Sequence, residues 1–358
     1  MILKLGKRKI LIMSLIFITI LILFMHFMPK KNKENNISKT VNTKSTEKKK
    51  TKFIKYVEFN VNYPALEKAM KIDVETEGKI SWIDILSFLG AKYGGKFQNR
   101  YSEKDINNLV SNLKSGKSLE ELTKNMKLFS YYREAYGAVL GGFLGKYKAQ
   151  TSKKEKDKTK FIEKYGLKVF LPIAKTFPFN HYKDFGSSRS YGFSRPHLGH
   201  DLMAATGTPV IAIESGYVEC KGWNQYGGWR IGIRSFDKKR YYYYAHLRKN
   251  RPYHVNIEKG KAIKAGDVIG YVGRTGYSRN EDVNNINTSH LHVGLQLVFD
   301  ESQKECNNEI WVDLYSITQL LEKNRSAVIR ENETKEYYRQ LDFSEESYED
   351  FIKNQNNF

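Results

Sequence analysis

The sequence predicts a multidomain protein: an N-terminal transmembrane helix, then an all-α helical domain, then an all-β domain built on an antiparallel sheet. Three observations predict this order. A basic N-terminus leads into a long apolar run, and serine-led amphipathic segments follow it. After a second lysine-rich stretch, the hydrophobic period changes from 3.6 to 2, which marks the change from helices to strands.

Length and charge limit the classes of protein. A chain of 358 residues is too long for one average domain and suits two domains with connecting segments. The formal net charge of +21 argues for an anionic partner, and an anionic membrane or cell wall would fit. The chain shows no zinc-finger spacing, no RNA-recognition signature and no basic helix with heptads. We therefore expect no nucleic-acid partner.

Residues 1–28 predict a cytoplasmic stub and a transmembrane signal anchor. The apolar run from Ile10 to Met28 has 19 residues, which roughly matches the ~30 Å hydrocarbon core of a bilayer. A secretory signal has a shorter apolar region and ends at small residues, whereas this run ends in Phe27 and Met28. An uncleaved anchor is therefore favoured over a cleaved signal. We expect a single-pass protein of the cell membrane, with its C-terminal domains extracytoplasmic.

Residues 29–52 predict a basic, flexible stalk. This segment holds nine lysines, two glutamates and no aromatic residue, so it cannot bury enough apolar surface to fold. Two interpretations remain open. The stalk binds anionic lipid or wall polymer, or it is only a soluble tether.

Residues 53–150 predict a small domain of about four or five helices, whose role the sequence does not indicate. Gly90 is the expected end of one helix, and Phe129 to Leu140 carries large apolar residues at helical spacing. The expected helix starts are serines that precede apolar groups, two of them followed three residues later by an acidic residue: Ser81, Ser102 and Ser118.

Residues 151–164 predict a linker, and residues 165–310 predict the all-β domain. Asp237-Lys238-Lys239-Arg240 separates two strand-like runs and predicts a hairpin. The expected strands include Val210 to Ile213, Tyr217 to Cys220, Arg230 to Phe236, Tyr241 to His246, Val268 to Val272 and His290 to Phe299. Residues 311–358 predict a helical tail that becomes acidic, with eight Asp or Glu against three Lys or Arg after residue 330.

The two cysteines, Cys220 and Cys306, are too few for a disulfide framework and do not form a CxxC motif. Two buried thiols and one disulfide both remain open.

Five of the eight histidines lie in three short segments of the β domain, and this grouping with an aspartate indicates a metal site. On a strand, residues two apart share a face, so His290 and His292 stand side by side above apolar alternate residues. Imidazole and carboxylate ligands suit zinc, and a catalytic zinc keeps three protein ligands and one open position. His197, Asp201 and one histidine of the HxH pair would give that set.

In this order and on an all-β domain, the segments resemble the lysostaphin-type (LytM-like) zinc metalloendopeptidases, whose pattern is HxGxD, then Tyr-x-His-Leu, then HLH. The resemblance covers about 165–310, roughly two-fifths of the chain. The matching stretches are Arg195-Pro196-His197-Leu198-Gly199-His200-Asp201, Thr206-Gly207-Thr208-Pro209-Val210, Gly227-Gly228, Tyr244-Ala245-His246-Leu247, Gly266-Asp267-Val268-Ile269-Gly270, Gly273-Arg274-Thr275-Gly276 and His290-Leu291-His292.

The resemblance implies one Zn²⁺ per chain, held by His197, Asp201 and His292. It implies a catalytic pair that does not bind the metal, His290 and His246, which positions and deprotonates water and stabilises the oxyanion. Some relatives carry a tyrosine where Tyr191 stands, six residues before the first ligand, so Tyr191 is a further candidate. His200 matches no role in the family, and we expect it to be exposed to solvent.

The sequence departs from the family at Tyr277 to Ser289, a polar run between the Thr-Gly element and HLH that we expect to lie beside the groove. The resemblance implies a membrane-anchored zinc metalloendopeptidase that hydrolyses peptide bonds of peptidoglycan, in the stem peptide or the cross-bridge. An envelope protein could bind the helical domain. The alternative is a scaffold or regulator in a cell-envelope or sporulation complex that uses the β domain to bind a partner.

Overall fold

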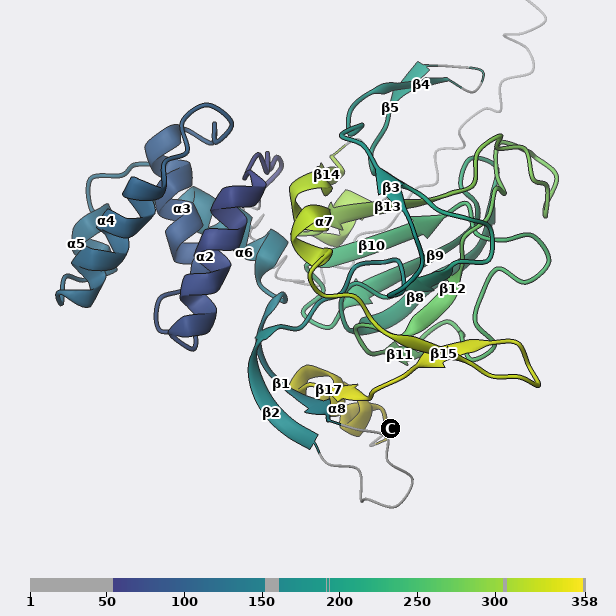
Figure 1. Cartoon of the computed structure of the whole chain (residues 1–358). Helices are drawn as coiled ribbons and strands as arrows, with labels where there is room; N and C mark the ends of the chain where they lie inside the picture. The colour runs from purple at the N-terminus through teal and green to yellow at the C-terminus, as the bar shows by residue number, and fades with distance from the viewer. Residues whose placement is uncertain (1–53, 152–160, 191, 193, 305–307, 357–358) are drawn as a thin grey trace, which may run out of the picture. The chain divides into compact units, whose positions relative to one another are not determined.

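A computed structural model describes residues 54–151, 161–190, 192, 194–304 and 308–356 (Figure 1). Lys52–Phe358 forms one compact unit. Within the described ranges, no helix is both long enough and apolar enough to cross a bilayer. The predicted span at Ile10 to Met28 and the predicted stalk lie outside the described residues.

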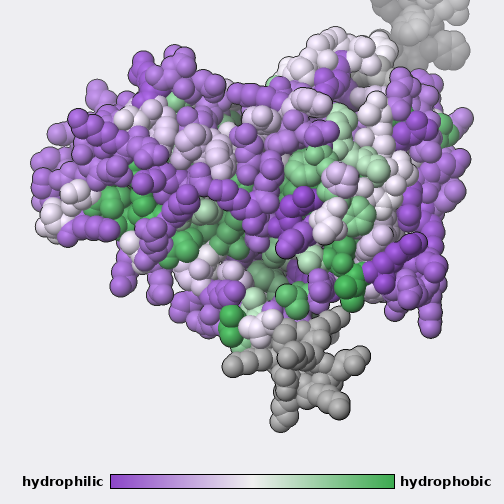
Figure 2. Space-filling model, in the orientation of Figure 1, coloured by the Kyte–Doolittle hydropathy of each residue, from purple (hydrophilic) through white to green (hydrophobic). Residues whose placement is uncertain are grey.

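The helical prediction for residues 53–150 is confirmed up to Leu140. Ser118 begins its helix with a complete capping box, and Ser81 accepts a hydrogen bond from the Ile83 amide. Ser102 occupies an N-cap position but makes no side-chain cap bond. The helices are α2 (Tyr63–Glu75), α3 (Trp82–Tyr93), α4 (Glu103–Lys114), α5 (Leu119–Thr123) and α6 (Phe129–Leu140). Hydrophilic side chains predominate on the helices in Figure 2, as expected for helices that bury one apolar face.

The prediction that Gly90 ends a helix is wrong. Helix α3 continues to Tyr93 and ends at Gly94, which adopts a left-handed conformation with φ of 61°. Gly90 has a packing role instead, because a Cβ there would lie 3.0 Å from Tyr132 and Tyr136 of α6. The absence of a side chain lets α3 and α6 approach each other closely.

Strands replace the end of the helical domain and part of the predicted linker. Strand β1 (Leu144–Gln150) pairs along its length with β2 (Phe161–Leu167), and β17 (Phe343–Ser344) adds to the other edge of β1. The sequence reasoning missed this hairpin because its strands are rich in lysine and border the lysine-rich run.

The β domain contains a sheet with the strand order β11-β8-β9-β10-β13-β6-β3, and β14 pairs with β13 (Figure 1). The predicted hairpin over residues 237–240 is confirmed, since it joins β9 to β10. The strands of this sheet are β3 (Asn180–His181), β6 (His200–Met203), β8 (Gly216–Asn224), β9 (Gly228–Ser235), β10 (Arg240–Ala245), β11 (Ala262–Ile263), β13 (His290–Leu297) and β14 (Ile310–Val312).

Smaller elements surround this sheet. Strands β4 (Ser188–Ser190) and β5 (Ser194–Pro196) form a short hairpin, and β7 (Pro209–Ile211) pairs with β12 (Val268–Tyr271). A 3₁₀ turn, Glu301–Lys304, follows β13.

The prediction of a helical tail over 311–358 is corrected to a mixed segment. Helix α7 (Tyr315–Leu321) is followed by the short strands β15 (Val328–Arg330), β16 (Tyr337–Arg339) and β17, and then by helix α8 (Glu346–Asn356). The β15–β16 hairpin packs on the β domain, where Glu336 is buried and accepts a hydrogen bond from Tyr271.

The helices and the sheet share one continuous hydrophobic core, to which Trp82, Phe143 and Val218 all belong. A buried polar contact also joins them, because Arg240 of β10 donates to the carbonyl of Ala138 in α6 at 2.8 Å. The predicted domain boundaries stay a prediction, but the two parts are packed against each other rather than joined only by a linker.

Candidate metal centre

Three side-chain atoms converge at one point above the sheet. Nε2 of His197 lies 3.1 Å from Oδ1 of Asp201 and 2.9 Å from Nδ1 of His292, which in turn lies 3.0 Å from Oδ1 of Asp201. A tetrahedral zinc ion with bonds of ~2.0–2.1 Å spaces its ligand atoms about 3.3 Å apart. The three atoms therefore fit one zinc ion. Among the described residues, His197, Asp201 and His292 form a group of side chains that could hold a metal ion.

Strand register explains how distant residues form this group. Strands β6 and β13 are antiparallel neighbours, and Asp201 is the register partner of His292. His197 follows β5 and reaches the same point from a turn. Gly199 in that turn leaves space for the ligand, because a Cβ there would lie 2.4 Å from Cε1 of His292. The glycine of the HxGxD pattern thus makes room for His292.

A second layer of side chains orients His197. Its Nδ1 lies 3.2 Å from the backbone carbonyl oxygen of Asp184 and 3.2 Å from Oδ2 of the same residue, so it donates to Asp184 and leaves Nε2 free as a metal ligand. Nη2 of Arg189 lies 2.9 Å from Oδ2 of Asp184 and 3.2 Å from Oδ2 of Asp201. The sequence analysis missed Asp184 and Arg189, because neither lies in a motif and only folding brings them to the site.

The two predicted catalytic histidines stand beside the three donors. The rings of His246 and His290 are 4.9 Å apart, and Nε2 of His290 lies 3.8 Å from Oδ1 of Asp201. Nδ1 of His246 donates to the Thr275 carbonyl at 2.9 Å, and Nδ1 of His290 donates to the Thr288 carbonyl at 2.8 Å. A carbonyl oxygen can only accept, so in the neutral form each Nε2 is the proton acceptor.

The backbone at His246 is unusual. This residue has a φ of 60°, a left-handed conformation that costs energy for a side chain of this kind. Two hydrogen bonds hold it in place: Nδ1 donates to the Thr275 carbonyl, and the backbone amide of His246 donates to the Gly227 carbonyl. Strain of this kind concentrates at functional sites, which agrees with a role for this histidine in the chemistry.

Burial and charge set the protonation of the site before any metal binds. Burial would raise the pKa of Asp201, but hydrogen bonds from His197 and His292 outweigh it and hold this pKa well below its usual range. Burial would lower the pKa of His197, but bonds to Asp184 and Asp201 outweigh it and raise this pKa to about 9. Burial lowers the pKa of His246 well below 6.5. His246, which does not bind the metal, is therefore kept neutral.

The prediction that His200 is exposed is wrong, since it is completely buried. Its Nε2 lies 2.8 Å from Nδ1 of His181, and its Nδ1 lies 3.5 Å from Oδ1 of Asp184. His200 directly precedes a ligand on a strand, so its side chain points to the other face of β6. There it lies beside Asp184, the residue that contacts Nδ1 of His197.

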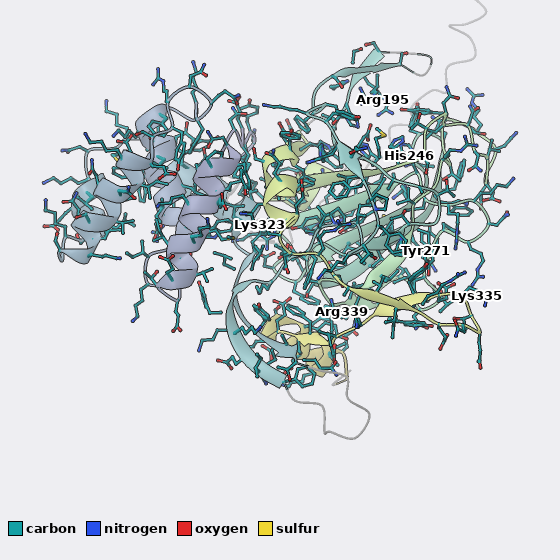
Figure 3. The ribbon with its side chains drawn as sticks, in the orientation of Figure 1. Arg195, His246, Tyr271, Lys323, Lys335 and Arg339 are labelled. Carbon is teal, nitrogen blue, oxygen red and sulfur yellow. The ribbon has the colours of Figure 1, made fainter. Side chains whose placement is uncertain are left out.

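The metal centre lies in a pocket of about 210 Å³ to which the polar insertion contributes Tyr277. Nη2 of Arg195 donates to Oη of Tyr277 at 3.3 Å, and the same guanidinium lies over the ring of Tyr226. The expectation that Tyr277 to Ser289 lies beside the groove is therefore confirmed for Tyr277. Figure 3 shows Arg195 at the β4–β5 hairpin and His246 at the end of β10. The further candidate Tyr191 lies outside the described residues.

Comparison with known proteins matches residues 195–305 to peptidase family M23. Over 125 residues the chain is 38% identical to the L-Ala--D-Glu endopeptidase of Bacillus subtilis (strain 168). The aligned stretch covers 35% of this chain and 36% of the relative. Over 83 residues it is 42% identical to lysostaphin of Staphylococcus simulans, covering 23% of this chain and 16% of the relative. The match thus spans about a third or less of these curated relatives.

Among solved structures, the catalytic domain of lysostaphin from Staphylococcus simulans is 29% identical, with a TM-score of 0.31, covering 39% of this chain and 92% of that one. The family match falls on the residues that hold the His-Asp-His centre. Residues 195–305 therefore form a domain of peptidase family M23, of the lysostaphin and LytM type, whose members are zinc metalloendopeptidases.

Proposed function

We propose that this protein is a zinc metalloendopeptidase that hydrolyses peptide bonds of peptidoglycan. One observation carries the proposal: His197, Asp201 and His292 bring three donor atoms within 3.1 Å of one another, beside two further histidines whose Nε2 atoms are proton acceptors. A purely structural zinc site is closed by four protein ligands, whereas this arrangement leaves a position toward the pocket.

The side chains divide the work between binding and proton transfer. His197, Asp201 and His292 would hold zinc, which when bound makes water a better nucleophile near neutral pH and polarises a carbonyl. Nε2 of His290 or His246 accepts a proton from the attacking water and delivers it to the leaving amide nitrogen. The same two groups, once protonated, donate hydrogen bonds to the oxyanion that develops on the carbonyl oxygen. No covalent intermediate with the chain is needed.

The relatives and the charge support the substrate class. The matched relatives include an L-Ala--D-Glu endopeptidase and lysostaphin. The chain carries a net charge of +21, which would concentrate it at an anionic wall. We infer that the scissile bond lies in the stem peptide or the cross-bridge of peptidoglycan.

Anchoring is part of the proposal and rests on the sequence. The apolar run from Ile10 to Met28 would hold the protein in the cell membrane, and the basic segment after it would place the peptidase outside the membrane within reach of the wall. The scaffold alternative stays open for the helical part, which could bind an envelope protein. It does not explain why two further histidines, His246 and His290, stand beside the three donors.

The test is peptidoglycan hydrolysis by the full chain in detergent, with zinc content measured on the same samples. Wild type should release new amino termini and contain one zinc per chain. His290→Ala should retain zinc and lose hydrolysis, whereas Asp84→Asn, a change on α3 at a surface ion pair, should alter neither. Zinc-loaded, folded wild type that releases no amino termini from any peptidoglycan would refute the proposal and favour the scaffold.

A further inference from the structure

A second pocket continues the metal pocket along the same face of the sheet. It encloses about 690 Å³ and shares Arg195, Tyr243 and His292 with the metal pocket. A substrate bound at the metal would therefore extend into this groove. The side chains of the groove then determine which residues next to the scissile bond are accepted.

Strand register places Arg230 on the floor of this groove. Tyr243 is the register partner of Gly232 in β9, and Arg230 lies two residues before Gly232, so both side chains point to the same face. Cζ of Arg230 lies 6.0 Å from the ring centre of Tyr243, whose ring lies 5.9 Å from that of His292. Extended peptide spans about 3.4 Å per residue, so Arg230 lies within about four residues of the metal.

Arg230 has no carboxylate partner among the described residues. Its Nη1 donates to Sγ of Cys220 at 2.9 Å, and a thiol is only a weak acceptor. Its Nε is buried and has no hydrogen-bond partner within the described part of the chain. With Nη1 bonded to the thiol and Nε buried, Nη2 is the nitrogen of this guanidinium that is left to donate to a carboxylate in the groove.

Other arginines of the same sheet show the contrast. Arg234, four residues further along β9, bonds Glu301 at 2.8 Å, and Arg240 of β10 bonds Glu214 at 2.7 Å. At the metal, Arg189 bonds Asp184. In the groove, Nε of Arg195 is buried and also lacks a partner among the described residues. Of the five arginines compared, Arg230 and Arg195 are the two without an acidic partner among the described residues, and both line the groove.

The carboxylates of the groove do not supply the missing acceptor. Glu219 bonds Lys304, and Glu309 accepts from Nε1 of Trp311 at 2.8 Å. We propose that the groove binds a carboxylate of the peptide substrate, with Arg230 as its principal partner and Arg195 on the side of the metal. The protein would then select acidic peptides over their carboxamide forms. This inference rests on the proposed function for the class of substrate.

The experiment uses the full chain and a matched pair of synthetic stem peptides, one with free side-chain and α-carboxylates and the other with carboxamides. Binding is measured by calorimetry and cleavage by release of amino groups. Wild type should bind and cleave the acid form about 10- to 100-fold better, the range expected for a charge-assisted hydrogen-bonded pair. Arg230→Gln should reduce this preference at least several-fold, because binding and cleavage of the acid form should fall more than those of the carboxamide form.

Two further variants make the result specific. Arg230→Lys keeps the charge but not the planar guanidinium and should retain part of the preference. Arg279→Gln removes one charge from an exposed position that lines neither pocket, and it should retain the whole preference.

Equal binding of the two peptides by wild type would overturn the inference, and so would an equal loss on both peptides in Arg230→Gln. The proposed function fails separately: wild type that prefers to bind the acid form but cleaves neither peptide would support the groove assignment and contradict the peptidase.

Discussion

Replacing Asp184 with alanine should weaken zinc binding although Asp184 is not a ligand. Its Oδ2 lies 3.2 Å from Nδ1 of His197, which the backbone carbonyl oxygen of Asp184 also approaches at 3.2 Å, and it accepts from Nη2 of Arg189 at 2.9 Å. The first bond fixes the ring and the tautomer that present Nε2 to the metal. The second shares the guanidinium between two carboxylates, because the same Nη2 also lies 3.2 Å from Oδ2 of Asp201.

The size of the effect follows from these two contacts. Loss of an outer partner of a histidine ligand costs about 10- to 100-fold in metal affinity, or ~1.4–2.8 kcal/mol. We expect Asp184→Ala to lie toward the upper end, because Arg189 would then compete with the metal for Asp201. Asp184→Asn, which keeps an acceptor oxygen but loses the charge, should lie toward the lower end.

Competitive titration with a fluorescent zinc chelator measures this affinity, with thermal unfolding of the metal-free protein as a check on folding. Asp84→Asn is the matched control, because it disrupts an Asp–Arg pair of similar geometry on α3. If Asp184→Ala binds zinc as tightly as wild type and the control, the second layer has no role in orienting His197.

Three further predictions concern the site and the core. Gly199→Ala should lower zinc content, because its Cβ would lie 2.4 Å from His292 and 2.9 Å from the Val293 carbonyl oxygen; normal zinc content by atomic absorption would contradict this packing argument. Glu214→Ala should cost about 3–5 kcal/mol in urea unfolding, because it leaves the guanidinium of Arg240, 1% exposed, without its main partner; a loss below about 1 kcal/mol would count against that role. Finally, the stability of the metal-free protein should fall as pH decreases below about 6.5. Burial lowers the pKa of His246 below its value in the unfolded chain, so the unfolded state takes up the proton first. His246→Gln should reduce this slope in unfolding measured at pH 7.5 and 5.5, and an unchanged slope would assign it to other groups.

Strand alternation is local, and it predicts which faces of the strands carry the site. The ligand set of His197, Asp201 and His292 is what the family resemblance implies, and it converges through the pairing of β6 with β13. Alternation along β13 places His290 and His292 on one face and Leu291 and Val293 on the other, and both leucine and valine are fully buried. The same alternation divides the tyrosines of β10, with Tyr242 and Tyr244 in the core. Strand period is a short-range property, so one sequence suffices to predict it.

Features that depend on distant contacts are not predicted. His200 looked like a spare surface histidine, but it is completely buried, and its imidazole contacts His181 of β3 and lies near Asp184, which follows that strand. Gly90 looked like a helix end, although its use is to let α6 approach α3. The sharing of one core by helices and sheet also lies beyond local patterns, and it argues for studying the full chain rather than an isolated β domain.

The division between ligands and proton-transfer groups is tested most directly by zinc content and hydrolysis, measured together in His292→Ala and His290→Ala. Nδ1 of His292 lies 3.0 Å from Oδ1 of Asp201, whereas Nε2 of His290 lies 3.8 Å from the same atom. His292→Ala should lose both zinc and hydrolysis, and His290→Ala should keep zinc at wild-type stoichiometry while hydrolysis falls at least 100-fold. Equal loss of zinc in the two folded variants would contradict the account.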